Sequence, residues 1–183
     1  MNKVIRWGIL GTGTIANTFA GDLNLVKTGV LGAVASRGLE KAEAFAKKYG
    51  AAKFYGSYEE LAKDPEIDAI YVASPHSQHK ENTLLCLNHK KAVLCEKPFA
   101  INATEAAEMI ECAKKNGVFL MEAMWTRFLP NIKYVNEIIE KGEIGAIRWL
   151  KADFGFALPE DFPASHRLLN KELGGGALLD VGI

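Results

Sequence analysis

The 183-residue sequence is poor in cysteine and carries no excess of charge. Its three cysteines, Cys86, Cys95 and Cys112, lie in apolar stretches without Cys-x-x-Cys spacing. They therefore predict reduced core thiols rather than a disulfide framework. Lysine plus arginine number 22, as do aspartate plus glutamate, so no net field favours nucleic acid or an anionic membrane. Any ligand has to be recognised at a local site.

A long hydrophobic segment is also missing. No apolar run approaches the roughly 18 residues needed to cross a bilayer, and Met1-Asn2-Lys3 leads directly into a strand-like pattern without a signal-peptide core. These absences predict a cytoplasmic protein that does not span a membrane. The length suggests one or two domains.

The most informative feature present is the opening segment. An apolar run over residues 4–10 passes through Gly11-Thr12-Gly13-Thr14-Ile15-Ala16 into a helical pattern. In a strand–turn–helix unit, such glycines let backbone N–H groups approach a pyrophosphate at the positive helix end. The alternative is an ordinary tight turn, but a second strand follows on schedule at residues 30–36, so a dinucleotide cradle is favoured.

The residues after this second strand indicate which cofactor is bound. NAD-specific units carry an acidic residue about 20 positions beyond the glycines, on the ribose 2′-hydroxyl. This chain has Ser36-Arg37 there, and a guanidinium binds the extra phosphate of NADP through paired hydrogen bonds. NADP is therefore predicted and NAD is disfavoured. The alternative is that Arg37 is a solvated loop residue.

Strand-like and helix-like patterns alternate along the first two thirds of the chain, which is typical of a Rossmann-type, doubly wound parallel sheet in the α/β class. Further helices are expected at 39–49, 58–63, 79–89 and 102–116, and further strands at 53–55, 69–73, 92–95 and 118–122. Gly117 is expected to end the helix before it. The dinucleotide-binding domain is predicted to span residues 1–123.

Residues 124–183 differ in character. A helix is expected over 130–141 and one long strand over 147–156, followed by two prolines and the run Gly174 to Gly176. A lone strand leaves unpaired backbone at both edges. We therefore do not expect this segment to be stable alone. Either two copies of the chain dimerise through the strand, or the segment stays poorly ordered.

Two segments carry polar residues where strands end, which is where open α/β sheets bind ligands. Residues 73–79 follow one strand and Cys95-Glu96-Lys97-Pro98 follows the next. A lysine at a buried strand end is partly desolvated and can donate to a substrate oxygen, although a surface charge is the alternative. His76 and His79 could suggest a metal, but a third ligand at useful spacing is missing, so no metal is predicted. Cofactor lining or helix capping is the default role for both histidines.

Together these segments resemble the glucose-fructose oxidoreductase and inositol dehydrogenase family, often called Gfo/Idh/MocA. The resemblance rests on residues 11–16, 74–79, 96–99, 121–128 and 174–183. The run Glu-Ala-Met-Trp-Thr-Arg-Phe, with Arg37, is most similar to the branch of dimeric dihydrodiol dehydrogenases and NADP-dependent aldose (xylose) 1-dehydrogenases. The resemblance implies a homodimer whose second domain is α+β and mostly antiparallel, with residues 124–183 as its incomplete beginning.

The resemblance also implies roles for individual residues. Lys97 would bind the reacting oxygen and Asp180 would support the acid/base, giving the catalytic pair; the family's acid/base tyrosine would come directly after Ile183. The substrate pocket would be lined by Trp125, Arg127 and Phe128. The predicted cofactor-binding set is Gly11, Gly13, Thr14, Ile15, Ser36, Arg37, Ser74, Pro75, His76, His79, Glu96 and Lys97.

The function implied is that of an NADP-dependent dehydrogenase acting on CH–OH donors. Hydride would pass between NADP and a sugar, polyol or dihydrodiol-type substrate, with the nicotinamide performing the difficult step. Two alternatives stay open at this point. The chain could be a catalytically silent NADP-binding module, or a truncated fragment without independent activity.

Overall fold

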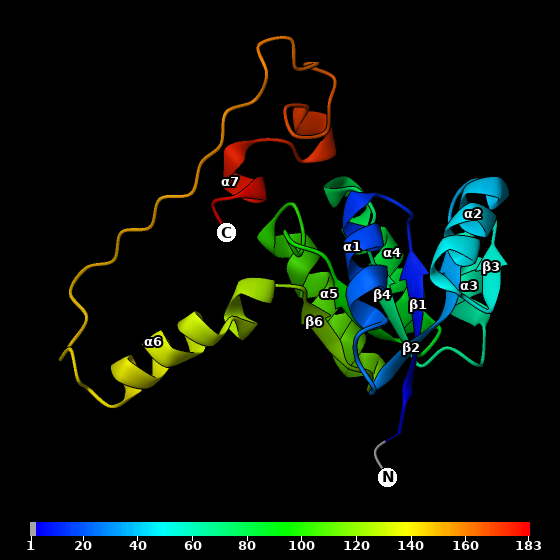
Figure 1. Ribbon diagram of the computed structural model, residues 1–183, viewed down its shortest axis with the longest axis horizontal. Helices are drawn as coiled ribbons and strands as arrows, with labels where there is room; N and C mark the ends of the chain where they lie inside the picture. The colour runs from blue at the N-terminus through cyan, green and yellow to red at the C-terminus, as the bar shows by residue number, and fades with distance from the viewer. Residues whose placement is uncertain (1–2) are drawn as a thin grey trace.

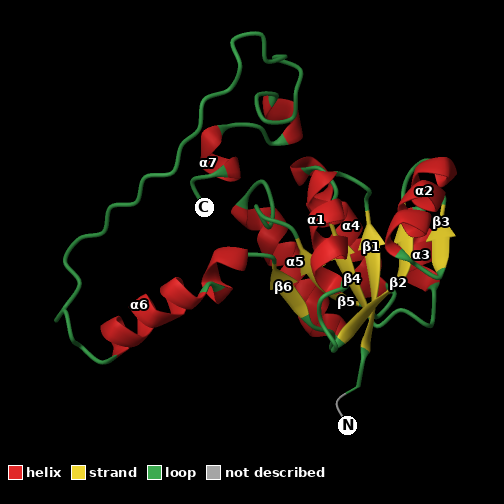
Figure 2. Cartoon of the chain, in the orientation of Figure 1, coloured by secondary structure: helices red, strands yellow, loops and turns green. Residues whose placement is uncertain are grey.

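The computed structural model describes residues 3–183, and its centre is a six-stranded parallel sheet (Figures 1 and 2). The strand order β3-β2-β1-β4-β5-β6 places the first strand in the middle. Strands β2 and β3 are added on one side of β1, and β4, β5 and β6 are added on the other, so the order of addition reverses between β1 and β4. This is the doubly wound order of a dinucleotide-binding fold. The strands are β1 (Ile5–Leu10), β2 (Gly29–Ala35), β3 (Lys53–Tyr55), β4 (Ala69–Val72), β5 (Ala92–Cys95) and β6 (Leu120–Glu122).

Helices cover both faces of this sheet, and further helical segments follow it. The α-helices are α1 (Thr14–Leu23), α2 (Leu39–Tyr49), α3 (Tyr58–Lys63), α4 (His79–Asn88), α5 (Ala103–Asn116), α6 (Pro130–Glu140) and α7 (Ala177–Asp180). Short 3-10 helices are η1 (His76–Gln78), η2 (Trp125–Phe128) and η3 (Lys171–Leu173). The predicted Rossmann-type fold is confirmed, with boundaries that differ from the expected ones by a residue or two.

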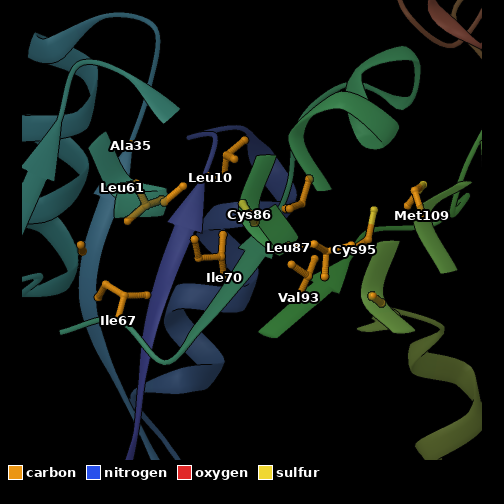
Figure 3. Close-up of a cluster of buried hydrophobic side chains, with 14 residues drawn as sticks. Leu10, Ala35, Leu61, Ile67, Ile70, Cys86, Leu87, Val93, Cys95 and Met109 are labelled. Atoms are coloured by element: carbon orange, nitrogen blue, oxygen red, sulfur yellow. The ribbon is translucent and has the colours of Figure 1, made fainter. Parts of the chain in front are cut away.

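The hydrophobic core forms two layers because side chains alternate along each strand. Ile70 and Val72 of β4 point into a layer shared with α3, α4 and α5, which Figure 3 shows around Leu61, Leu87 and Met109. Tyr71, between them in sequence, points into the opposite layer, against α1 and α2. β4 is buried along its whole length, as the central position of a parallel sheet requires.

Helix α5 illustrates how local sequence sets the element boundaries. The Asn102 side chain accepts a hydrogen bond from the Glu105 N–H at 2.9 Å and so caps the helix start. Gly117 ends the helix with φ of 65°, in the left-handed region that favours glycine. The predicted end at Gly117 is therefore confirmed.

The strand predicted over residues 147–156 is wrong. These residues have no regular secondary structure, and Trp149 and Phe154 are 77% and 73% exposed. A strand exists only with a neighbour to pair with, and the part of the chain that the structure describes offers none beside this segment. Residues 141–165 instead run as an extended connection from α6 to the segment carrying η3 and α7 (Figure 1).

Candidate membrane spans and candidate metal-binding clusters are both absent from residues 3–183. None of the helices there is long and apolar enough to cross a membrane. Within the same residues, no three histidine, cysteine or acidic side chains gather in a way that could hold a metal ion. Cys86 and Cys95 are buried, Cys112 is partly buried, and all three are free thiols.

Candidate active site

A cleft of about 1180 Å³ opens where β1, β2, β4 and β5 end. Segments from each strand end contribute to it, as the topology of an open parallel sheet requires. The cleft includes every predicted cofactor-binding residue and both residues of the predicted catalytic pair. These are Gly11, Gly13, Thr14, Ile15, Ser36, Arg37, Ser74, Pro75, His76, His79, Glu96, Lys97 and Asp180.

The glycine turn after β1 forms the floor of the cleft. Gly11 has φ of +102°, and a Cβ there would lie 2.9 Å from the Ala73 carbonyl oxygen, so only glycine fits without strain. A Cβ on Gly13 would meet no atom within 4 Å. Helix α1 starts directly after Gly13 with no side-chain cap and no acidic residue in its first turn. Its first N–H groups are thus available to an anion in the cleft.

At the end of β2 the cleft is basic. Ser36 is buried, whereas Arg37 is exposed and lines the cleft together with Lys41 of α2. Helix α2 also lacks a side-chain cap at its start. Sequence reasoning missed Lys41, although its position four residues after Arg37, in the first turn of an expected helix, was a usable signal.

Asn17, which was also not among the predicted site residues, fixes α1 against α2. Its amide nitrogen donates to the Gly13 carbonyl oxygen at 2.9 Å. Its amide oxygen accepts hydrogen bonds from Lys48 Nζ at 2.9 Å and from the Tyr49 hydroxyl at 2.8 Å. The network holds the turn at Gly13 and places Lys48 at the wall of the cleft.

His79 joins the loops that follow β4 and β5. Its ring is fully buried, with Nδ1 2.7 Å from the Pro98 carbonyl oxygen and Nε2 2.9 Å from the Ser74 carbonyl oxygen. Burial lowers the pKa of His79, although both carbonyl contacts oppose that shift. One imidazole therefore joins the loop after β4, which carries predicted cofactor-binding residues, to the loop after β5, which carries Lys97.

The loop after β5 carries Lys97, which pairs with α7. Lys97 Nζ lies 3.5 Å from Asp180 Oδ1 and also donates to the Asp180 carbonyl oxygen. Their side chains are only 25% and 16% exposed, so solvent screens the pair less than it would at an open surface. The peptide bond between Lys97 and Pro98 is cis. The structure thus brings together the two residues that the family resemblance implied as catalytic.

Arg167, which was not among the predicted site residues, is a second cation at this end of the cleft. Its Nη1 lies 3.9 Å from Asp180 Oδ1 and 3.4 Å from His76 Nε2. His76 is buried, its Nδ1 lies 3.3 Å from the Gly174 carbonyl oxygen, and burial lowers its pKa. The segment that carries η3 and α7 therefore closes one side of the cleft through Arg167, Gly174 and Asp180.

The predicted substrate-pocket residues Trp125, Arg127 and Phe128 lie elsewhere. They form η2, and none of them lines the cleft. Trp125 is 60% exposed and Phe128 55%. The structure does not bring these side chains to Lys97, and their assignment to the substrate pocket stays a prediction.

Comparison with known proteins agrees with this geometry. Residues 5–124 match the model of an oxidoreductase family with an NAD-binding Rossmann fold, and residues 132–183 match the GFO/IDH/MocA C-terminal domain. The chain belongs to the Gfo/Idh/MocA oxidoreductase family.

Curated members of this family include trans-1,2-dihydrobenzene-1,2-diol dehydrogenases. The mouse protein is 48% identical over 98% of this chain, and the zebrafish (Danio rerio) protein is 45% identical over the same share. The chain spans about half of these relatives, 53% of each.

Solved structures of the Gfo/Idh/MocA family share the fold. KijD10, a 3-ketoreductase from Actinomadura kijaniata in complex with NADP and TDP-benzene, is 30% identical with a TM-score of 0.86. The match covers 97% of this chain and 54% of KijD10. An NAD-binding protein from Listeria innocua is 28% identical with a TM-score of 0.78, covering 98% of this chain and 52% of that one.

Proposed function

We propose that this chain supplies the NADP-binding half of an NADP-dependent dehydrogenase that acts on a CH–OH group of a sugar, polyol or dihydrodiol-type substrate. The observation that carries the proposal is one continuous cleft holding a glycine cradle at Gly13, a guanidinium at Arg37 and an amine–carboxylate pair at Lys97 and Asp180. The reaction is assigned to the protein that carries this chain, since the relatives are about twice as long.

The residues present fit a dinucleotide. Four strand ends lie side by side in the order β2, β1, β4 and β5, and three steps of about 4.8 Å give a span of roughly 14 Å. The open space over Gly13 and the uncapped start of α1 suit a pyrophosphate midway along this span. When bound, the nicotinamide ring supplies the hydride chemistry.

NADP is favoured over NAD by the charges at the end of β2. Arg37 and Lys41 both line the cleft there, and no carboxylate joins them in that part of the described cleft wall. Two cations would bind a 2′-phosphate through charge-assisted hydrogen bonds, whereas a 2′-hydroxyl would gain little from them. The NADP named in the KijD10 structure supports the same choice.

At the other end, Lys97 is placed to donate a hydrogen bond to the substrate oxygen. Its ammonium is held by Asp180 near the closed side of the cleft, and partial burial strengthens its electrostatic effect. Asp180 keeps Lys97 oriented and would support an acid/base group beside it. The dihydrodiol named for the curated relatives favours a substrate with neighbouring hydroxyls.

Substitution of Arg37 tests the proposal. The unaltered chain should bind NADPH well ahead of NADH, and Arg37→Asp should narrow or invert that ratio. The expected loss of NADPH affinity corresponds to about 1.5–3 kcal/mol, as for a hydrogen bond to a charged group. Titration of both cofactors by fluorescence measures the ratio.

A matched control separates this local effect from net charge. Lys27→Asp makes the same change of charge at an exposed residue outside the cleft, and it should leave the ratio unchanged. Equal binding of NADPH and NADH by the unaltered chain would reject NADP specificity. Binding of neither cofactor would reject the proposed function.

A further inference from the structure

Tyr71 is a buried polar residue directly beneath the cleft that the proposed function leaves without a role. It lies in the middle of β4 and is 2% exposed. Its hydroxyl donates a short hydrogen bond to Glu96 Oε1, while Glu96 Oε2 accepts the Lys97 backbone N–H at 3.0 Å. Both oxygens of the Glu96 carboxylate are therefore held, one of them from inside the core.

The ring of Tyr71 has little freedom to move. Phe19 of α1 stacks on it with ring centroids 4.0 Å apart and an interplanar angle of 18°, and Trp7 packs edge-on against Phe19 at 5.4 Å. Burial, and then the charge of Glu96, raise the pKa of Tyr71, so its hydroxyl keeps its proton and stays a donor. The Tyr71 phenol is therefore a fixed hydrogen-bond donor to the Glu96 carboxylate, which lines the cleft.

The neighbours of Glu96 explain why its carboxylate needs to be held in place. The next side chain along the chain is that of Lys97, whose ammonium pairs with Asp180. A carboxylate free to rotate would compete with Asp180 for this ammonium, because opposite charges a few ångströms apart attract strongly in a partly buried site. With one oxygen on Tyr71 and the other on a backbone N–H, the Glu96 carboxylate stays fixed in position and leaves Lys97 to Asp180.

We propose that Tyr71 is a positioning residue that fixes the Glu96 carboxylate at the nicotinamide end of the cleft, where its charge favours the oxidised, cationic ring over the reduced, neutral one. The inference rests on the proposed function. It assigns Glu96 to that end because Arg37 marks the opposite end, three strands away.

The test uses Tyr71→Phe, which keeps the ring and its stacking but removes the donor. Binding of three probes is measured by titration: NADP in its oxidised form, NADPH, and adenosine 2′,5′-bisphosphate, which has no nicotinamide. Relative to NADPH, oxidised NADP should bind about three- to tenfold more weakly to the variant than to the unaltered chain, the range that one hydrogen bond spans. Affinity for adenosine 2′,5′-bisphosphate should stay within a factor of two.

Two further variants sharpen the result. Glu96→Gln should shift the same ratio in the same direction, and the double variant should show no additional shift, because both changes remove one effect. Tyr55→Phe is the matched control: it removes a phenol hydrogen bond to Asp64, of 2.8 Å, on β3 outside the cleft. It should leave all three affinities unchanged.

The outcomes separate the two proposals. A Tyr71→Phe chain with an unchanged ratio, or one that binds all three probes equally more weakly, would reject the positioning role while NADP binding stands. An unaltered chain that binds neither form of NADP would reject the proposed function, and the role of Tyr71 with it.

Discussion

Two glycines of the same turn meet different demands. Gly11 is required by the fold, because its φ of +102° and the Ala73 carbonyl oxygen at 2.9 Å leave no place for a Cβ. Gly13 has an ordinary φ of −75° and open space around it, so the fold alone would accept alanine there. What an added methyl group would fill is the cleft.

Alanine at each position should therefore separate folding from binding. Gly13→Ala should cost the free energy of unfolding only about 1 kcal/mol, as for alanine at a helix N-cap, and should abolish the rise in melting temperature that NADPH produces. Gly11→Ala should cost about 1–3 kcal/mol from backbone strain, with or without ligand. Thermal unfolding with and without NADPH measures both, and a Gly13→Ala chain still stabilised by NADPH would contradict the cradle.

Residue by residue, the sequence predicts what local motifs encode. The glycine turn, Ser36-Arg37 and the polar segments after β4 and β5 could all be placed in one cleft, since parallel strands end at one edge. Arg167 could not, because it meets His76 across 91 positions of sequence. Tyr71 was hidden for a similar reason: a tyrosine inside an apolar strand reads as core until the partner of its hydroxyl is known.

The helices and strands of the first 123 residues could be predicted because local hydrophobic periodicity and capping residues mark each of them. The segment 147–156 has the apolar content of a strand, yet a strand is stabilised by hydrogen bonds to a neighbour that local sequence cannot reveal. Because the described residues supply no such neighbour, Trp149, Leu150 and Phe154 are exposed.

Hydrogen exchange should reflect this contrast between elements. We expect amides of residues 147–156 to exchange within seconds, since the described residues give them no backbone partner. Amides of β1 and β4, in the middle of the sheet, should be protected for far longer. Protection of 147–156 together with a doubled mass in light scattering would instead show this segment pairing with a second copy.

The two buried histidines after β4, His76 and His79, should make the stability of the folded chain depend on pH. Burial lowers the pKa of both His76 and His79, so the folded state prefers their neutral forms. As pH falls through the ordinary histidine range near 6.5, the unfolded chain takes up protons first, and the folded state loses stability. The urea midpoint should therefore drop between pH 7.5 and 5.5.

A variant identifies the source of this pH dependence. His79→Asn lacks one of the two buried groups, so its urea midpoint should change less between the two pH values, whatever its absolute stability. Asp64 and Asp68, whose pKa values are lowered, lose their contribution only at more acidic pH. An equal drop in the variant and the unaltered chain would exclude His79 as the source.

At the scale of the whole molecule, the sheet and the segment carrying α7 are separate in sequence, but both contribute residues to the cleft. The contacts are few: Gly174 and Arg167 on His76, and Asp180 on Lys97. Family resemblance predicted that Asp180 reaches this place. The route of the connection over residues 141–165 could not be predicted, because nearly all of these residues are exposed and the described residues offer little packing that would fix a path.

The salt bridge between Lys97 and Asp180 has a thermodynamic consequence. Docking of the α7 segment and binding of a ligand use the same residues, so they are linked equilibria, and each must change the other by the same factor. If NADPH holds α7 in place, α7 raises the affinity for NADPH equally; if NADPH displaces α7, α7 is a competitor. Exchange at residues 167–180 with and without NADPH measures one side of this equality, and titration of an Asp180→Asn chain measures the other.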